Sequence, residues 1–236
     1  QKIDFQRLKD VDVSRTRLID DNLGYQWDRV VTYLKKENRF VVVDGIEVKR
    51  SDYFTFTNLW HTRQVLQKGS QDGHFWFDTR YDHINGDPLP QGNSLLLSFP
   101  ENPAGKQIGT FAIERHFQPE TAIYQTVSRF YRAGDRELFV TILTPHASKE
   151  EAAIGLKNWT FLPTDKPGQA FGMEISAGEE KALLGFKLDL EMDLAGEDVR
   201  PRYRQPLGMV KYDGVESDAS YLFVSLDKKQ IYYYAT

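Results

Sequence analysis

Cysteine is absent from the sequence, and its absence excludes disulfide bonds, thiolate metal sites and cysteine nucleophiles. A chain of 236 residues can bury a stable core without such links, so the cytoplasm and the periplasm stay equally open. Long apolar runs are also missing. The longest, residues 40–43 and 138–143, are far too short to span a bilayer, and no cleavable signal sequence is present. We therefore expect a soluble chain without a membrane span.

Positive charge is not concentrated anywhere along the chain. The 30 Lys and Arg residues are outnumbered by 34 Asp and Glu residues, and the formal net charge is −4. A general nucleic-acid binder needs a concentrated basic face to neutralise phosphates, so we expect no nucleic-acid partner. The sequence also lacks a Gly-x-Ser-x-Gly motif, a P-loop and a dinucleotide fingerprint, which leaves nucleophilic and nucleotide chemistry without support.

Aromatic residues are abundant, at 13% of the chain. They lie in short alternating runs separated by Gly, Pro, Asn and Asp, which is typical of β-strands joined by turns. No amphipathic helices separate these runs, so the pattern predicts an all-β fold, a large multi-stranded antiparallel β-sandwich that forms one domain over residues 1–236. Little helix is expected: a capping box at Ser148 and Glu151, and a short helix within residues 2–13. Asp213 and Gly214 predict a tight turn.

The histidines are the first candidates for chemistry. In the predicted strand at residues 53–63, one face becomes polar toward its C-terminal end, where it carries His61 and Arg63. In the next predicted strand, residues 74–82, one face carries Asp78. If the two strands form a hairpin, His61 and Asp78 approach each other.

A third strand then brings His116 toward this pair. Two imidazoles and one carboxylate with an open position can hold a zinc ion. The alternative is that these histidines are half-buried packing residues with one satisfied nitrogen, which is the commoner situation in a β-sandwich.

Arginines lie close to the histidines in the sequence, and two interpretations stay open for them. Planar guanidinium groups bind carboxylates and sulfates through paired hydrogen bonds, so they can form a cleft for acidic ligands. They can equally be solvated groups that pair with the many acids of the chain. The residues concerned are Arg63, Arg80, Arg115, Arg129 and Arg132. The tyrosines at residues 232–234 favour an aromatic edge strand over a sugar-stacking platform.

Several segments together resemble a known family. They are RVVTYLKK at residues 29–36, RFVVVDGI at 39–46, NLWHT at 58–62, LLLSFP at 95–100, YRAGD at 131–135, FVTILTPH at 139–146 and SDA at 217–219. Their order and content resemble the C-terminal β-domain of heparinase II/III-like polysaccharide lyases. The resemblance covers most of the chain, although each segment is short.

The resemblance implies a β-sandwich that follows an N-terminal (α/α) toroid, with the substrate cleft between the two. It implies cleavage of uronic-acid-containing glycans by β-elimination, with His61 as the catalytic residue of the β-domain. Arg63, Arg80 and His83 are then the substrate-binding candidates. Because the toroid supplies other catalytic groups, we expect this chain to be inactive without it. The implied partners are an acidic polysaccharide, such as a glycosaminoglycan, and the toroid domain, and the implied location is periplasmic or secreted.

Some members of this family also bind zinc in the β-domain, and His61, Asp78 and His116 resemble those ligands in order and spacing. In members that have both features, the catalytic histidine lies just before the first zinc histidine. Here Leu59 is at the earlier position, so the catalytic and metal roles compete for His61. The alternative function is a non-catalytic carbohydrate-binding or structural β-sandwich module, which we expect to show an exposed aromatic platform or groove.

Overall fold

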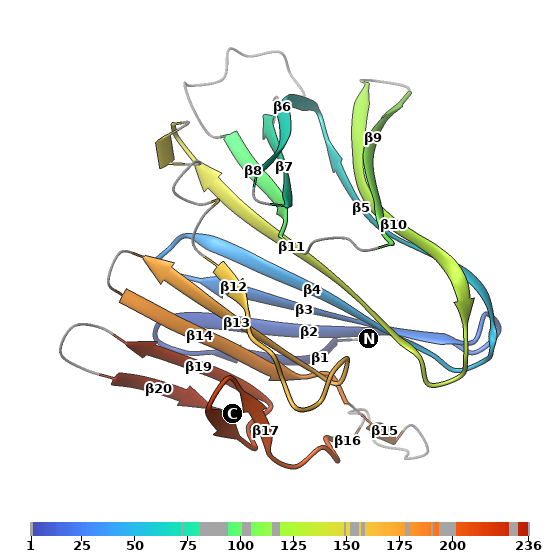
Figure 1. Ribbon diagram of the computed structural model, residues 1–236, viewed down its shortest axis with the longest axis vertical. Coiled ribbons are helices and arrows are strands. Elements are labelled where there is room, and N and C mark those ends of the chain that lie inside the picture. Colours follow the sequence, from blue (N-terminus) through green and yellow to red (C-terminus); the bar gives the residue numbers. More distant parts are fainter. Residues whose placement is uncertain are drawn as a thin grey trace. The chain divides into compact units, whose positions relative to one another are not determined.

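The computed structural model confirms the nearly all-β, antiparallel fold (Figure 1). It describes residues 2–71, 73–80, 94–100, 105–114, 119–148, 150–151, 156, 159–177, 180–189, 191–193, 202–226 and 231–235. The chain divides into two compact units, residues 1–157 and 158–236. The predicted single sandwich over the whole chain therefore stays a prediction, and each unit is described by itself.

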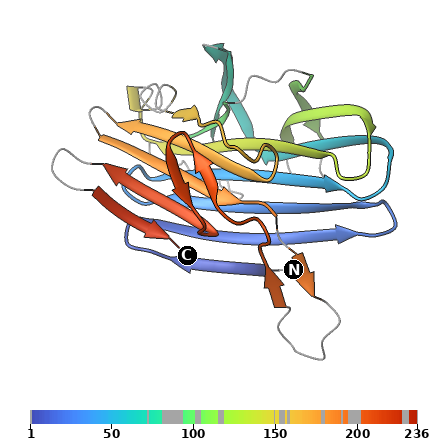
Figure 2. The same cartoon turned by 60° about the horizontal axis from the view of Figure 1, so that its bottom comes forward.

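The first unit contains eleven of the described strands. Their bounds are β1 Lys2–Arg7, β2 Val11–Asp20, β3 Tyr25–Leu34, β4 Arg39–Val48, β5 Asp52–Thr62, β6 Gln64–Gln71, β7 His74–Arg80, β8 Ser94–Phe99, β9 Gln107–Ile113, β10 Glu120–Tyr131 and β11 Arg136–His146. They form an eight-stranded sheet in the order β1-β2-β3-β4-β11-β8-β7-β6 and a three-stranded sheet in the order β5-β10-β9. Figure 2 shows β2, β3 and β4 as long strands lying side by side, with the shorter β1 along the edge beside β2.

The two longest apolar runs of the sequence pair with each other at the centre of the eight-stranded sheet. Val43 on β4 lies opposite Val140 on β11, and neighbouring pairs continue in antiparallel register. Side chains on both faces of these strands are buried, which explains why the runs are continuously apolar instead of alternating.

The three-stranded sheet packs against one face of the eight-stranded sheet. One mixed core joins residues from β4, β5, β10 and β11, namely Ile46, Val48, Phe56, Val127, Tyr131 and Phe139. A second core joins Phe77, Leu97, Phe99 and Ile123, with Trp60 packed against it. Even-numbered residues of β5 from Phe54 to Trp60 therefore face inward, and odd-numbered residues face outward.

A buried polar network crosses the same interface, and Asp44 on β4 lies at its centre. Asp44 is fully buried and accepts hydrogen bonds from Trp27 Nε1 at 2.8 Å, from Arg29 Nε at 2.7 Å and from Asn58 Nδ2 on β5. The hydrogen bond with Asp44 raises the pKa of Arg29. Asn58 Oδ1 in turn accepts a bond from Trp60 Nε1 at 2.5 Å. These hydrogen bonds offset the large free-energy cost of burying the Asp44 carboxylate away from water.

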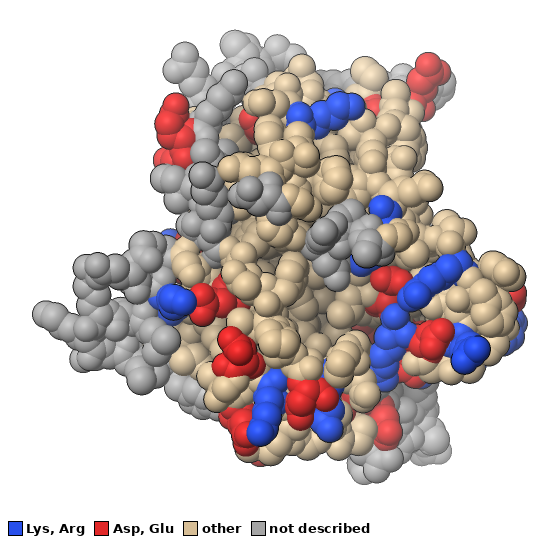
Figure 3. Space-filling model, viewed as in Figure 1, with Lys and Arg blue, Asp and Glu red and all other residues tan. Residues whose placement is uncertain are grey.

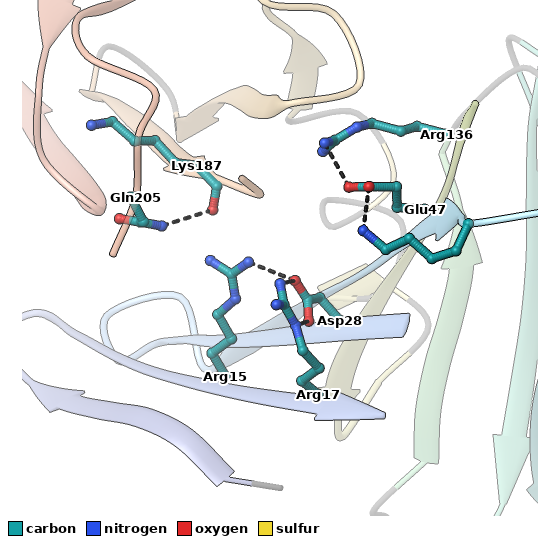
Figure 4. Close-up of polar contacts among 8 residues, drawn as sticks. Arg15, Arg17, Asp28, Glu47, Arg136, Lys187 and Gln205 are labelled. Carbon is teal, nitrogen blue, oxygen red and sulfur yellow. Dashed lines mark hydrogen bonds and ion pairs between the residues drawn. The ribbon is translucent and has the colours of Figure 1, made fainter. Parts of the chain in front are cut away.

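Buried charges also occur on the outer strands of the large sheet. Arg15 Nη2 on β2 lies 2.6 Å from Asp28 Oδ2 on β3, and Arg17 Nε lies 2.5 Å from Asp28 Oδ1. Figure 4 shows both guanidinium groups directed at this one carboxylate, and the separate pair of Glu47 and Arg136. The Arg15 and Arg17 side chains are thus fixed by ion pairs between neighbouring strands.

The second unit is built on a five-stranded sheet in the order β12-β13-β14-β19-β20. Its strands are β12 Trp159–Phe161, β13 Ala170–Ala177, β14 Glu180–Lys187, β15 Glu191–Asp193, β16 Arg202–Arg204, β17 Val210–Tyr212, β18 Val215–Ser217, β19 Tyr221–Leu226 and β20 Ile231–Ala235. The β17–β18 hairpin confirms the predicted turn, because Asp213 has a φ of 45° and Gly214 a φ of 94°. β20 is an edge strand, as residues 232–234 predicted.

Two predictions about local structure were wrong. The expected helix within residues 2–13 is strand instead, because β1 pairs with the edge of the sheet through β2. The expected hairpin between residues 53–63 and 74–82 does not form, because the intervening polar segment makes its own strand, β6, and that strand pairs with β7. One half of the capping box is confirmed: Glu151 N donates to Ser148 Oγ at 3.3 Å, whereas the Glu151 carboxylate accepts from Ala147 N at 2.8 Å. Among the described residues, no helix is long and apolar enough to cross a membrane.

Replacing Asp44 with alanine should lower the free energy of unfolding by about 3 kcal/mol. The variant leaves Arg29 and Asn58 without their buried partner, and the partial exposure of Arg29 keeps the loss near the lower end of the range for broken buried pairs. Urea unfolding followed by circular dichroism measures the change. Asp52→Ala removes an exposed carboxylate as the control and should change stability by less than about 0.5 kcal/mol. Equal effects of the two substitutions would contradict the central role of Asp44.

Candidate functional site

The outward face of β5 ends in an exposed histidine that is paired with a carboxylate. His61 lies opposite Ala122 on β10, and Glu120 is the first residue of β10. His61 Nδ1 lies 3.2 Å from Glu120 Oε2, with the two side chains 37% and 17% exposed. A carboxylate at this distance orients an imidazole and fixes which ring nitrogen carries the proton. The pair therefore has the geometry of an oriented acid–base group that faces solvent.

The same outward face extends away from His61 along β5 and β10. Its side chains are Tyr53, Thr55, Thr57 and Leu59 on β5 and Tyr124, Thr126, Ser128 and Phe130 on β10, each lying opposite a partner on the neighbouring strand. We call this set the hydroxyl–aromatic face. None of these side chains carries a formal charge at neutral pH. On the side of the molecule drawn in Figure 3, charged side chains gather where β4 ends and β11 begins, and the surface over β9 is largely uncharged.

Asp78, the predicted third metal ligand, lies elsewhere. His146 Nε2 on β11 donates to Asp78 Oδ1 at 3.0 Å, and both side chains are buried, at 3% and 9% exposure. Neighbouring residues of a strand point to opposite faces of the sheet. Phe77, next to Asp78, and Trp60, next to His61, both pack in the core between the sheets. His61 and Asp78 thus point away from that core on different sheets.

The described residues of the expected zinc triad therefore do not converge on one point. Among the described parts of the chain, no cluster of three or more His, Asp or Glu side chains has the geometry to hold a metal ion. His116 lies outside the described residues. The zinc triad stays a prediction, and no chemical step below uses a metal.

The predicted substrate-binding residues are partly placed. Arg63 is half-buried at the bend between β5 and β6, two residues after His61. Arg80 lies opposite Gln64, so the backbone brings Arg80 next to the bend that contains Arg63. The side chain of Arg80 is not described, and His83 lies outside the described residues. The structure thus gathers His61, Arg63 and the backbone of Arg80 near the junction of β5 and β6.

Another arginine from the sequence analysis is paired with an acid. Arg129 Nη2 lies 3.0 Å from Glu137 Oε2, and its guanidinium carbon lies 4.4 Å from the centre of the Tyr131 ring. Tyr131 donates to the same carboxylate oxygen at 2.9 Å, and burial raises the pKa of Tyr131 to about 12. Arg129 therefore follows the second interpretation, in which arginines pair with the acids of the chain.

Two partners were missed by sequence reasoning. Glu120 is 59 residues from His61, and His146 is 68 residues from Asp78, so their contacts depend on strand order and not on local spacing. A signal for the hydroxyl–aromatic face was present in the sequence. On β10, residues 124, 126 and 128 repeat the order aromatic, hydroxyl, hydroxyl found at residues 53, 55 and 57 on β5, and residue 130 adds a second aromatic side chain.

The buried Asp78–His146 pair should be strongly coupled. A double-mutant cycle with Asp78→Ala and His146→Ala should give a coupling energy of about 1–3 kcal/mol, because either single change leaves a buried polar group without its partner. The exposed pair Lys181 and Glu174, at 2.8 Å, is the control and should give about 0.5 kcal/mol or less. Urea unfolding of all variants measures both values. Coupling no larger than in the control would show that the buried bond is not formed in solution.

No protein-family model and no curated protein matches the sequence. Solved structures do match the fold. A crystal structure of heparinase III aligns with a TM-score of 0.50 over 80% of this chain and 27% of that chain, at 13% identity. Heparan sulfate lyase HepC from Pedobacter heparinus aligns with a TM-score of 0.50 over 80% of this chain and 28% of that chain, at 10% identity.

A second heparinase III structure gives a TM-score of 0.51 over 79% of this chain and 27% of that chain, at 10% identity. The chain thus spans just over a quarter of the length of these proteins. At such low identities the likeness concerns the fold. This chain has the fold of one part of the heparinase III and HepC structures.

Proposed function

We propose that the chain is the β-domain of a polysaccharide lyase that cleaves uronic-acid-containing glycans by β-elimination. In this proposal it forms one wall of the active-site cleft. The observation that carries the proposal is the exposed His61–Glu120 pair, on a fold shared with heparinase III and HepC. The larger size of those proteins supports a further domain as the opposite wall.

β-Elimination needs three actions at a uronate. The carboxylate must be neutralised so that the proton on C5 becomes acidic, a base must remove that proton, and an acid must protonate the departing glycosidic oxygen. When His61 donates its Nδ1 proton to Glu120, the neutral ring carries its lone pair on Nε2. Nε2 is then the atom that takes or returns a proton, and Glu120 is a positioning residue.

The remaining actions come from other groups. Arg63, two residues after His61, is the described candidate of this chain for neutralising the uronate carboxylate, and Arg80 stays a candidate from the sequence. The second acid–base group belongs, by the family resemblance, to the helical toroid domain. Elimination is therefore a property proposed for the whole protein, acting on acidic glycans in the periplasm or outside the cell.

A second function is favoured by a separate observation. The hydroxyl–aromatic face exposes the rings of Tyr53 and Phe130, as expected of a non-catalytic carbohydrate-binding module. Such a module would bind glycans without using His61 for chemistry. The two functions differ in the expected effect of removing the His61 imidazole. A lyase would lose elimination, whereas a binding module would keep its binding.

His61→Ala, made in the full protein that its gene encodes, should lower kcat for elimination by about 10²- to 10⁴-fold, because a positioned acid–base group is lost. The absorbance of the unsaturated uronate product measures the rate. Ser70→Ala, an exposed change at the far end of β6, is the control and should retain full activity. Unchanged turnover in His61→Ala would refute the catalytic assignment. If the wild-type protein binds the glycan but shows no elimination, the binding module is favoured.

Glu120→Gln tests the positioning role. The amide keeps the shape of the carboxylate but removes its charge, so kcat should fall by about tenfold with little change in KM. Restoration of kcat by Glu120→Asp would support an electrostatic role. A change in KM alone, with kcat intact, would contradict it.

A further inference from the structure

The end of the hydroxyl–aromatic face that lies far from His61 carries an exposed aromatic pair. Tyr53 is 78% exposed and Phe130 is 49% exposed, and they lie opposite each other on β5 and β10. Their ring centres are 5.3 Å apart at an angle of 68°. Two large rings held on paired strands and open to solvent form a fixed apolar surface, which is the kind of surface that ligands stack on.

The middle of the face is polar but uncharged. Thr55 Oγ1 and Ser128 Oγ are 2.8 Å apart, and Thr57 Oγ1 and Thr126 Oγ1 are 2.7 Å apart. These cross-strand pairs hold the hydroxyl groups in two rows, each able to form further hydrogen bonds with a ligand. A protein partner or a second copy of the chain would bury an apolar centre, so a centre of hydroxyl pairs does not suit either.

A second aromatic pair lies at the His61 end of the face: Tyr124 is opposite Leu59, and Phe111 is in register with the Ala122–His61 pair. The ring centres of Phe111 on β9 and Tyr124 on β10 are 5.9 Å apart. A Cβ atom at Gly109 would lie 2.7 Å from the hydroxyl oxygen of Tyr124 and 2.9 Å from its Cζ. Glycine at this position therefore lets the Tyr124 ring lie directly over the backbone of β9.

We propose that the hydroxyl–aromatic face binds an oligosaccharide lengthwise along β5 and β10. Sugar rings stack on Phe111–Tyr124 and on Tyr53–Phe130, and sugar hydroxyls bond to the threonine and serine pairs between them. The neutral, hydroxyl-lined surface matches the uncharged faces of the pyranose rings in such a chain. The inference rests on the proposed function and deepens it by assigning a remote subsite.

The distance along the strand sets the length of the ligand. Tyr53 and His61 are eight residues apart, so a straight strand would separate them by at most about 27 Å. A disaccharide at His61 does not reach the Tyr53–Phe130 pair, whereas a longer oligosaccharide does. Contacts with this pair should therefore appear only for longer ligands. They should also persist in salt, because they involve no charge pairs.

The test measures binding by the chain itself with isothermal titration calorimetry, using uronic-acid oligosaccharides from disaccharide to octasaccharide. The double variant Tyr53→Ala/Phe130→Ala should weaken octasaccharide binding by about tenfold or more and leave disaccharide binding unchanged. Phe5→Ala removes another exposed ring, on β1, and should have no effect. Circular dichroism and thermal unfolding confirm that each variant is folded.

The outcomes separate this inference from the proposed function. Octasaccharide binding that is unchanged in the double variant, or equally weakened in Phe5→Ala, would overturn the remote subsite, even if His61→Ala abolishes elimination. Loss of the length dependence at high salt would also overturn it, because charge pairs would then carry the binding. Length-dependent binding by this chain, together with no elimination by the full protein that its gene encodes, would support the subsite and refute the lyase.

Discussion

The first unit depends on the buried carboxylate of Asp44. It lies on a central strand of the large sheet, and Asn58 from the small sheet donates to it, so one charged group ties the two sheets together. Burial of a charge is tolerated only with nearly complete hydrogen bonding, and Trp27 and Arg29 supply the remaining bonds. A shift of β5 by one residue would remove Asn58 from this network and leave the carboxylate under-satisfied.

The orientation of the candidate site follows from that constraint. With Asn58 directed inward, strand alternation directs Thr57, Leu59 and His61 outward. The same register places His61 beside Glu120 and aligns the hydroxyl pairs of β5 and β10. The polar network inside the sandwich and the hydroxyl–aromatic face outside it are therefore two consequences of one register.

Sequence reasoning predicted what local periodicity determines and missed what strand order determines. The all-β class and the outward position of His61 follow from alternation within single strands. β6 was missed because an edge strand that pairs on one side needs few apolar residues, and its sequence is mostly polar. Once β6 takes the place beside β7, Asp78 is separated from His61 and meets His146 instead. No spacing rule along the chain contains that information.

In the lyase proposed above, the charge distribution would divide the work of elimination between the parts of the protein. The hydroxyl–aromatic face carries no formal charge, so it can orient a glycan by stacking and neutral hydrogen bonds but cannot neutralise a uronate. Neutralisation needs cations held at the scissile sugar, and on this chain the nearest candidates are at the bend after His61, where Arg63 lies. A neutral surface along the glycan, with cations only at one end, would hold the glycan in place. The surface would not compete with those cations for the carboxylate of the scissile sugar. In such a site, position along the face determines which sugar reaches the imidazole.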